Sequence, residues 1–248
     1  MQLLVSMVTF NRLDYTKRTI ESFQNTIQVP HYLLICDNNS SDGTQEYLKE
    51  LYRVGGCDNI ILNPDNYYPG KATNIGWEYG LRCFPQATHL MRLDNDMHFE
   101  NGWDLLAEKY FETIPQLGQV GLDFDGGENK PCAYYNGLGL NSHPGNVGGP
   151  NIIKREIFDK GVRYSEVKWC QENSITGYED TDLSLKIQEM GYLMGHMQER
   201  LSWTFAVNFY NNSVYNTKEN WEYYKDYYLQ TMHERGLDTD SVFLSNLQ

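Results

Sequence analysis

Short apolar segments alternate with helical stretches over the first 95 residues, and this alternation constrains the fold more than any other feature. The apolar segments are strand-like and occupy residues 3–10, 32–36, 59–62 and 88–93. The stretches between them have helical character, at about residues 15–25, 42–53 and 70–84. Strands and helices that alternate at this spacing form βαβ units with right-handed crossovers. The sequence therefore predicts an α/β fold with a Rossmann-like, mostly parallel central sheet flanked by helices.

Polar residues follow three of these strands directly. Asn11 and Arg12 come after the first strand, Asp37 ends the second, and Asp94 and Asp96 follow the fourth. The carboxyl ends of parallel strands meet at one edge of a sheet, and ligands of such sheets bind beyond that edge. We therefore expect these side chains to line one crevice.

The triplet Asp94-Asn95-Asp96 carries two carboxylates one residue apart. The two groups repel each other unless a positive charge lies between them. A hard divalent cation is the natural candidate, because it takes oxygen ligands and often shares them with phosphate oxygens. The alternative is a solvated turn, since Asp and Asn also favour turns.

The chain is strongly acidic, with a formal net charge of −13 and a pI near 4.8. Such a surface repels nucleic acids and anionic lipids, which argues against both as partners. An acidic protein that binds a phosphate ligand must supply local positive charge through a metal, a lysine or helix N-termini.

Cysteine usage and hydropathy predict a cytoplasmic protein without a membrane span. The five cysteines are widely spaced and form no Cys-x-x-Cys pair, as expected of reduced thiols. The N-terminus lacks the pattern of a signal peptide. No apolar run approaches the roughly 20 residues that a membrane-spanning helix needs.

The second half of the chain is less regular. Strands are expected at residues 120–124, 133–135, 151–153 and 192–197, with helical segments at residues 155–160 and 183–190. In the latter helix, Leu183, Ile187 and Met190 share one face. An amphipathic helix is expected at residues 218–235. The sequence thus predicts one domain over residues 1–205 and a C-terminal helical extension, residues 206–248, packed on it.

Residues 136–150 contain five glycines and two prolines. This composition predicts a loop that changes conformation over the site, as a lid or an acceptor-side segment.

A second acidic cluster, Glu179, Asp180 and Asp182, lies just before the helix expected at residues 183–190. Acidic side chains at a helix start are explained by the helix dipole alone. Three carboxylates within four residues exceed what a cap needs, however, and one of them could act as a general base toward a hydroxyl group.

The ordered set of motifs in this chain resembles the family 2 glycosyltransferases of the GT-A fold. The motifs occupy residues 9–12, 36–44, 70–76, 94–96, 148–155 and 177–183, and the resemblance covers about residues 3–195. It implies a metal-dependent, inverting transfer of a sugar from a nucleotide diphosphate to an acceptor hydroxyl, as in polysaccharide or glycan biosynthesis.

The resemblance also implies roles for individual residues. Asp94 and Asp96 are the expected ligands of Mn²⁺ or Mg²⁺, and Asp180 is the expected catalytic base, with Glu179 as the competing candidate. Lys71 would help to neutralise the leaving diphosphate. Nucleotide-sugar binding is expected of Thr9, Phe10, Asn11, Asp37, Asn38, Lys71, Asn74, Asp94 and Gly149.

The sequence departs from the family pattern in two places. Asp37-Asn38 replaces the Asp-Asp pair of many members, and because asparagine both donates and accepts hydrogen bonds, uracil, thymine and guanine all remain open. UDP is favoured over dTDP and GDP. Many members also have a further histidine ligand where this chain has residues 203–205, so the third metal ligand is His196, His98 or none.

Two other functions stay open from the sequence. One is a sugar nucleotidyltransferase on a similar scaffold, although the glycine-rich basic loop expected after the first strand is missing. The other is a non-catalytic carbohydrate-binding relative, although both acidic clusters are kept. The acceptor is a glycan, a lipid-linked molecule or a protein, and the motifs do not specify the donor sugar or the linkage.

Overall fold

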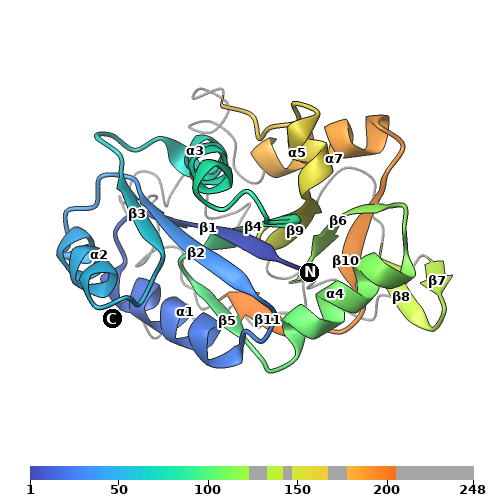
Figure 1. Ribbon diagram of the computed structural model, residues 1–248, viewed down its shortest axis with the longest axis horizontal. Coiled ribbons are helices and arrows are strands. Elements are labelled where there is room, and N and C mark those ends of the chain that lie inside the picture. Colours follow the sequence, from blue (N-terminus) through green and yellow to red (C-terminus); the bar gives the residue numbers. More distant parts are fainter. Residues whose placement is uncertain (123–132, 142–146, 167–177, 205–248) are drawn as a thin grey trace, which may run out of the picture.

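The computed structural model describes residues 1–122, 133–141, 147–166 and 178–204. These residues form a nine-stranded sheet of order β3-β2-β1-β4-β9-β6-β10-β8-β7 (Figure 1). Its first four strands are parallel to one another: β1 (Leu3–Thr9), β2 (His31–Asp37), β3 (Asn59–Leu62) and β4 (His89–Asp94). This half of the sheet confirms the alternating pattern of the sequence.

The other half of the sheet is mixed. It contains β6 (Leu117–Gly121), β7 (Ala133–Tyr135), β8 (Leu138–Asn141), β9 (Asn151–Lys154) and β10 (Leu193–Met197). β9 lies antiparallel between β4 and β6, whereas β10 is parallel to β6 and pairs with the antiparallel β8. β9 therefore joins the parallel half, which carries Asp94, to the half beside the second acidic cluster.

Helices cover both faces of the sheet. Figure 1 shows α3 (Tyr68–Cys83), α5 (Arg155–Asp159) and α7 (Tyr178–Glu189) on one side, and α1 (Leu13–Thr26) and α4 (Trp103–Thr113) on the other. α2 (Thr44–Arg53) follows β2 and contacts β3. Because side chains alternate along a strand, β1 sends Leu3, Val5 and Met7 toward α1 and α4, and Leu4 toward α3. Two apolar cores result, one on each face.

A separate two-stranded sheet lies just beyond β4, and sequence patterning did not predict it. It pairs β5 (Met97–Phe99) with β11 (Ser202–Thr204) in antiparallel register, Thr204 opposite Met97. The pairing brings the end of the described chain beside the Asp94-Asn95-Asp96 triplet.

Several expected boundaries were wrong. The glycine-rich stretch is not all loop, because β8 lies within it and pairs with β7 and β10. β6 begins three residues earlier than expected, at Leu117. α7 begins at Tyr178, so Glu179 and Asp180 belong to its first turn. Met190 lies beyond the helix and is 36% exposed, so of the three apolar residues only Leu183 and Ile187 are buried.

Some expectations fall outside the described residues. They include the segment 142–146 of the expected lid, the helix at residues 218–235, and the C-terminal extension. None of the described helices is both long and apolar enough to cross a bilayer.

Candidate active site

The loops after β1, β2 and β4 are tied together at the carboxyl edge of the sheet. The backbone N–H of Asn11 donates to Ser40 Oγ at 2.7 Å, and its side-chain oxygen accepts from the N–H of Ser41 at 2.9 Å. Asn95 donates to the carbonyl of Asn11 at 3.1 Å. The three polar turns therefore converge as expected.

The backbone at this edge is held in left-handed conformations. Asn11, Arg12, Asn39 and Tyr68 have φ values of 54°, 63°, 63° and 62°. Such values are uncommon outside glycine and cluster at functional sites, where surrounding contacts maintain them. The hydrogen bonds of Asn11 are contacts of this kind.

Asp37 lies beneath the surface of this edge, fully buried. Its oxygens accept hydrogen bonds from Thr9 Oγ1 at 2.9 Å, from the N–H of Ser40 at 2.9 Å, from the Ser40 hydroxyl, and from Gln45 Nε2 at 2.9 Å. Asp37 and Thr9 thus hold the loop after β2 in place through these hydrogen bonds.

Asn38 is also buried, at 1% exposure. Its side-chain oxygen accepts from Asn63 at 2.9 Å, and its amide donates to the carbonyl of Tyr68 at 3.3 Å. Asn38 therefore joins the loop after β2 to the start of α3. Phe10, its neighbour across the edge, is half-buried.

Each carboxylate of the Asp94-Asn95-Asp96 triplet is bound to an arginine. Arg12 Nη1 lies 2.7 Å from Asp96 Oδ2, and Arg92 Nε lies 3.1 Å from Asp94 Oδ1. Burial raises the pKa of Asp96, Arg12 opposes this shift, and Asp94 adds to it. Thr204 on β11 also hydrogen-bonds Asp96. The side chains of Asp94 and Asp96 are 29% and 15% exposed, so both carboxylates remain accessible.

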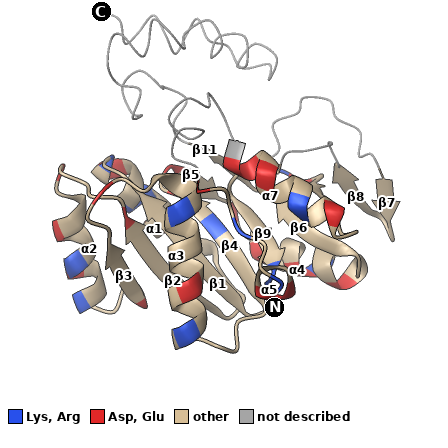
Figure 2. Cartoon of the chain, turned by 90° about the horizontal axis from the view of Figure 1, so that it is seen from above, with Lys and Arg blue, Asp and Glu red and all other residues tan. Residues whose placement is uncertain are grey.

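Arg92 brings the second acidic cluster to the first. Its Nη1 donates to Asp180 Oδ1 at 2.7 Å and to Glu179 Oε1 at 3.3 Å. Arg92 and Asp94 are two residues apart on β4 and project from the same face of the sheet. Figure 2 shows the acidic first turn of α7 at the same edge of the molecule as β5 and β11.

Sequence reasoning missed Arg92, although a signal was present. An arginine within the apolar stretch of residues 88–93 would be buried, and a buried charge requires partners. In the structure Arg92 is 5% exposed, with three carboxylates around it.

The environment of Asp180 raises its pKa. Burial makes the largest contribution, Arg92 opposes it, and Glu179 and Asp94 add to it. Because three carboxylates share one guanidinium, the cluster keeps an excess of negative charge. A carboxyl with a raised pKa beside a specific charged partner is a functional-site candidate.

Two glycines permit the close packing of these groups. A Cβ on Gly149 would lie 2.4 Å from Asp94 Oδ2. A Cβ on Gly70 would lie 2.6 Å from the carbonyl of Ser165 and 3.3 Å from the Cβ of Glu179. Gly149 thus borders the expected metal ligand, and Gly70 borders the start of α7.

Lys71 and Asn74 both lie on α3, but Lys71 contacts an aromatic ring whereas Asn74 is buried and hydrogen-bonded to backbone. The ammonium of Lys71 is 4.0 Å from the centre of the Tyr67 ring. Asn74 is buried, donates to the carbonyl of Tyr164 at 3.0 Å and accepts from its N–H at 3.1 Å. Asn74 therefore holds the segment that carries Tyr164, whose ring lies 5.4 Å from the guanidinium of Arg92.

Neither candidate histidine forms a metal-binding group with Asp94 and Asp96 among the described residues. His98 is in β5, next to Trp203 and 3.5 Å from Glu100 Oε1. His196 is in β10, which β6 and β9 separate from β4 in the sheet. Across the described part of the chain, no three His, Cys, Asp or Glu side chains are grouped as a metal site.

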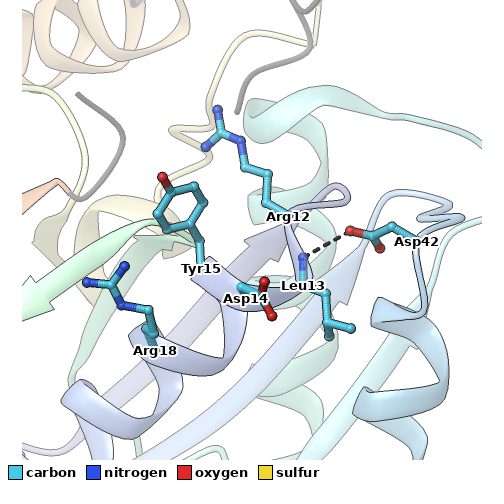
Figure 3. Close-up of a pocket in the computed structure, with 6 residues that line it drawn as sticks. All are labelled: Arg12, Leu13, Asp14, Tyr15, Arg18 and Asp42. Atoms are coloured by element: carbon cyan, nitrogen blue, oxygen red, sulfur yellow. Dashed lines mark hydrogen bonds between the residues drawn. The ribbon is translucent and has the colours of Figure 1, made fainter. Parts of the chain in front are cut away.

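A pocket of about 530 Å³ opens at the start of α1. Figure 3 shows Arg12, Tyr15 and Arg18 on one side of it, and Asp42 hydrogen-bonded to the N–H of Leu13 at 2.9 Å on the other. Because Arg12 also binds Asp96, the pocket adjoins the acidic triplet. Sequence reasoning did not predict it.

Comparisons with known proteins agree with the motifs. A family model described as glycosyl transferase family 2 matches residues 4–113, from β1 to the end of α4. No curated protein sequence matches the chain. The family match confirms the resemblance drawn from the motifs.

Three solved structures with a similar fold hold a nucleotide or a nucleotide sugar. GalNAc-T7 with UDP, GalNAc and Mn²⁺ gives a TM-score of 0.64 at 16% identity, covering 96% of this chain and 52% of that one. TarS 1–349 of S. aureus with UDP-GlcNAc gives 0.61 at 13%, covering 82% and 58%. Mannosyltransferase PcManGT from Pyrobaculum calidifontis, with GDP-Man and Mn²⁺, gives 0.61 at 15%, covering 80% and 56%. The chain spans less than two thirds of each, and the likeness establishes the fold.

Proposed function

We propose that this chain, which has the GT-A fold and matches the family 2 glycosyltransferases over residues 4–113, transfers a sugar from a nucleotide diphosphate to an acceptor hydroxyl with inversion. One observation carries the proposal. Arg92 binds Asp94 and also binds Asp180, 88 residues further along the chain, so that a candidate metal ligand and a candidate base flank one guanidinium.

Asp94 and Asp96 suit a divalent cation on the diphosphate. Their oxygens are the hard ligands that Mn²⁺ and Mg²⁺ accept, and each oxygen has a second lone pair besides the one facing its arginine. A bound metal would stabilise the negative charge of the leaving diphosphate. Mn²⁺ in the GalNAc-T7 and PcManGT structures supports this assignment.

Lys71 adds positive charge from the first turn of α3. The N-terminus of a helix attracts anions through its free N–H groups and its dipole. In this proposal the ammonium of Lys71 and the N-terminus of α3 both neutralise part of the diphosphate charge. Gly149, which has no side chain, leaves room for the Asp94 carboxylate. Thr9, Asp37 and Asn38 act from below, by fixing the loops on which the nucleoside rests.

Asp180 is the base in this proposal. As the acceptor oxygen attacks the anomeric carbon from one face, Asp180 takes the hydroxyl proton and the bond to the diphosphate breaks on the opposite face. Asp180 is preferred to Glu179 on the motif resemblance. Arg92 Nη1 also holds it more closely, at 2.7 Å against 3.3 Å for Glu179.

We infer UDP as the nucleotide, ahead of dTDP and GDP, with a glycan, a lipid-linked molecule or a protein as acceptor. The UDP-GlcNAc bound to TarS and the UDP bound to GalNAc-T7 support this choice. Because PcManGT binds GDP-Man, a guanine nucleotide is also to be tested. We also infer a cytoplasmic setting from the reduced cysteines expected of the sequence.

The test is hydrolysis of a panel of nucleotide sugars, including UDP-GlcNAc and GDP-mannose, with Mn²⁺ and with chelator. We expect release of the nucleoside diphosphate from at least one donor in the presence of Mn²⁺. Release of a nucleoside monophosphate would indicate different chemistry. A protein that binds carbohydrate but hydrolyses no donor would be the non-catalytic relative.

A further inference from the structure

We propose that Arg92 is a positioning residue that fixes the orientation of the general base Asp180 relative to the donor side of the site. The inference rests on the proposed function and deepens it. It comes from the contacts of one buried side chain, which the motifs of the sequence did not single out.

The guanidinium of Arg92 has two sides with different partners. Nε donates to Asp94 Oδ1 at 3.1 Å and Nη2 lies 3.5 Å from Asp94 Oδ2. Nη1 faces α7, where it donates to Glu179 and Asp180. Because the guanidinium is planar and rigid, it sets the distance between β4 and the first turn of α7.

Arg92 engages one oxygen of Asp180 and leaves the other. Asp180 Oδ1 accepts the hydrogen bond from Nη1 at 2.7 Å, whereas Oδ2 makes no hydrogen bond to any described residue. Fixing one oxygen in this way restricts rotation of the carboxylate. The second oxygen can then take a proton from a hydroxyl group in a defined direction.

The surroundings hold Arg92 itself. The ring of Tyr164 lies 5.4 Å from the guanidinium, and the Tyr164 hydroxyl accepts a hydrogen bond from Asn151 at 3.0 Å. Asn74 binds the backbone of Tyr164 on both its N–H and its carbonyl. Arg92 is therefore confined before any ligand binds, as a group that positions another must be.

A purely structural ion pair is the competing explanation. Removing Arg92 would then destabilise the protein by leaving buried carboxylates unpaired, and its effect on turnover would be independent of Asp180. A positioning role predicts instead that the effect of Arg92 on turnover disappears once Asp180 can no longer act as a base.

The experiment is a double-mutant cycle of Arg92→Lys and Asp180→Asn. Lysine keeps the charge but offers a single ammonium, which cannot replace the fork between Asp94 and Asp180. The readouts are kcat and KM for the nucleotide sugar that the wild type hydrolyses fastest, and the affinity for UDP with Mn²⁺ by calorimetry. Asp182→Asn is the matched control, because Asp182 bonds Lys186 on α7 rather than Arg92.

We expect Asp180→Asn to lower kcat by at least ~10² and Arg92→Lys to lower it by at least ~10-fold, with UDP affinity kept within a few-fold. In the Asp180→Asn background, Arg92→Lys should change kcat by less than about 2-fold. An equal loss in both backgrounds, or no loss in either, overturns the inference. If the wild type hydrolyses a donor, either of these results leaves the proposed function standing.

A second measurement covers the case in which Arg92→Lys does not fold. In ¹⁵N spectra of the arginine side chains, the Nη signals of Arg92 should broaden or shift in Asp180→Asn and stay unchanged in Asp182→Asn. Arg92 Nη signals that do not change in Asp180→Asn overturn the inference. A wild type that neither binds UDP with Mn²⁺ nor hydrolyses a donor overturns the proposed function, and this inference with it.

Discussion

At the scale of single residues, Gly149 shows how closely backbone approaches the expected metal ligand. Its Cα lies so near Asp94 that an added Cβ would meet Oδ2 at 2.4 Å. Gly148, the preceding residue, has open space at the same position, with no described atom within 4 Å. The pair therefore offers a change and its control at adjacent positions.

Gly149→Ala should displace the Asp94 carboxylate and weaken UDP binding in the presence of Mn²⁺ by at least ~10-fold, about 1.4 kcal/mol. Gly148→Ala should leave the affinity close to that of the wild type. Calorimetry on the two variants makes the comparison. Equal affinities would mean that Asp94 does not have to stay where the structure places it.

Asp96→Ala should remove the metal-dependent part of UDP binding. The variant loses one of the two carboxylates expected to hold the cation and leaves Arg12 without its partner at 2.7 Å. Its affinity for UDP in Mn²⁺ should fall to the level that the wild type shows with chelator. If the wild type binds UDP equally well with and without chelator, the metal assignment is wrong.

Residue roles were harder to predict than residue positions. The sequence placed Asp94, Asp96, Glu179 and Asp180 at one site through ordered motifs and the rule that strand ends converge. It could not show that an aspartate expected to bind the nucleotide, Asp37, also holds the loop after β2. That role depends on Ser40, Gln45 and Thr9 satisfying the carboxylate, which is a property of the folded loop.

At the scale of elements, the contact of α3 with β1 and β2 depends on a small residue. A Cβ on Gly76 would lie 2.1 Å from Ser6 Oγ and 2.9 Å from Cys36 Sγ, both in buried strands. The helix therefore packs directly on the strands whose ends form the site.

Gly76→Ala should destabilise the protein by about 1–3 kcal/mol, the usual effect of overpacking a core. Helix propensity alone predicts the opposite sign, since alanine favours a helix by about 1 kcal/mol over glycine. Urea unfolding of the wild type and the variant decides between them. A more stable variant would show that α3 can move away from the sheet at little cost.

The elements predicted well are those with local signals. Residues 3–113 repeat strand, turn and helix, and each has its own apolar pattern. β8 was missed because its glycine-rich sequence favours a loop, and only pairing with β7 and β10 makes it a strand. β5 and β11 are three-residue strands whose stability comes from a partner about a hundred residues away, so no local pattern could show them.

At the scale of the whole molecule, two electrostatic features have consequences: the net charge and the titration of His89. The net charge of −13 repels an anionic donor, so the arginines and the lysine of the site have to supply local positive charge. His89, at the start of β4, is a half-buried group whose titration is separate from that site. Burial, the largest cause, and the positive charges of the N-terminus and Lys154 together lower the pKa of His89 to about 4.

This pKa predicts a loss of stability in acid. His89 is neutral in the folded protein, whereas in the unfolded chain it titrates near 6.5, so the unfolded state binds the extra proton between about pH 6.5 and 4. Its contribution is complete above pH 6.5 and is lost progressively as the pH falls to about 4. His89→Gln should reduce the slope of unfolding free energy against pH in that window, measured by urea unfolding at several pH values. The same slope in both proteins would show that His89 is not the titrating group.

The placement of Arg92 and Asp94 on one face of β4 also limits how the length of this strand can change. Met91 and Leu93 point to the opposite face, into the apolar layer formed with α1 and α4. Inserting or deleting one residue here would exchange the two faces. The Arg92 guanidinium would move into the apolar layer, and an apolar side chain would face the three carboxylates. Substitutions along β4 alter one contact at a time, whereas a single-residue change in length disrupts the core and the site together.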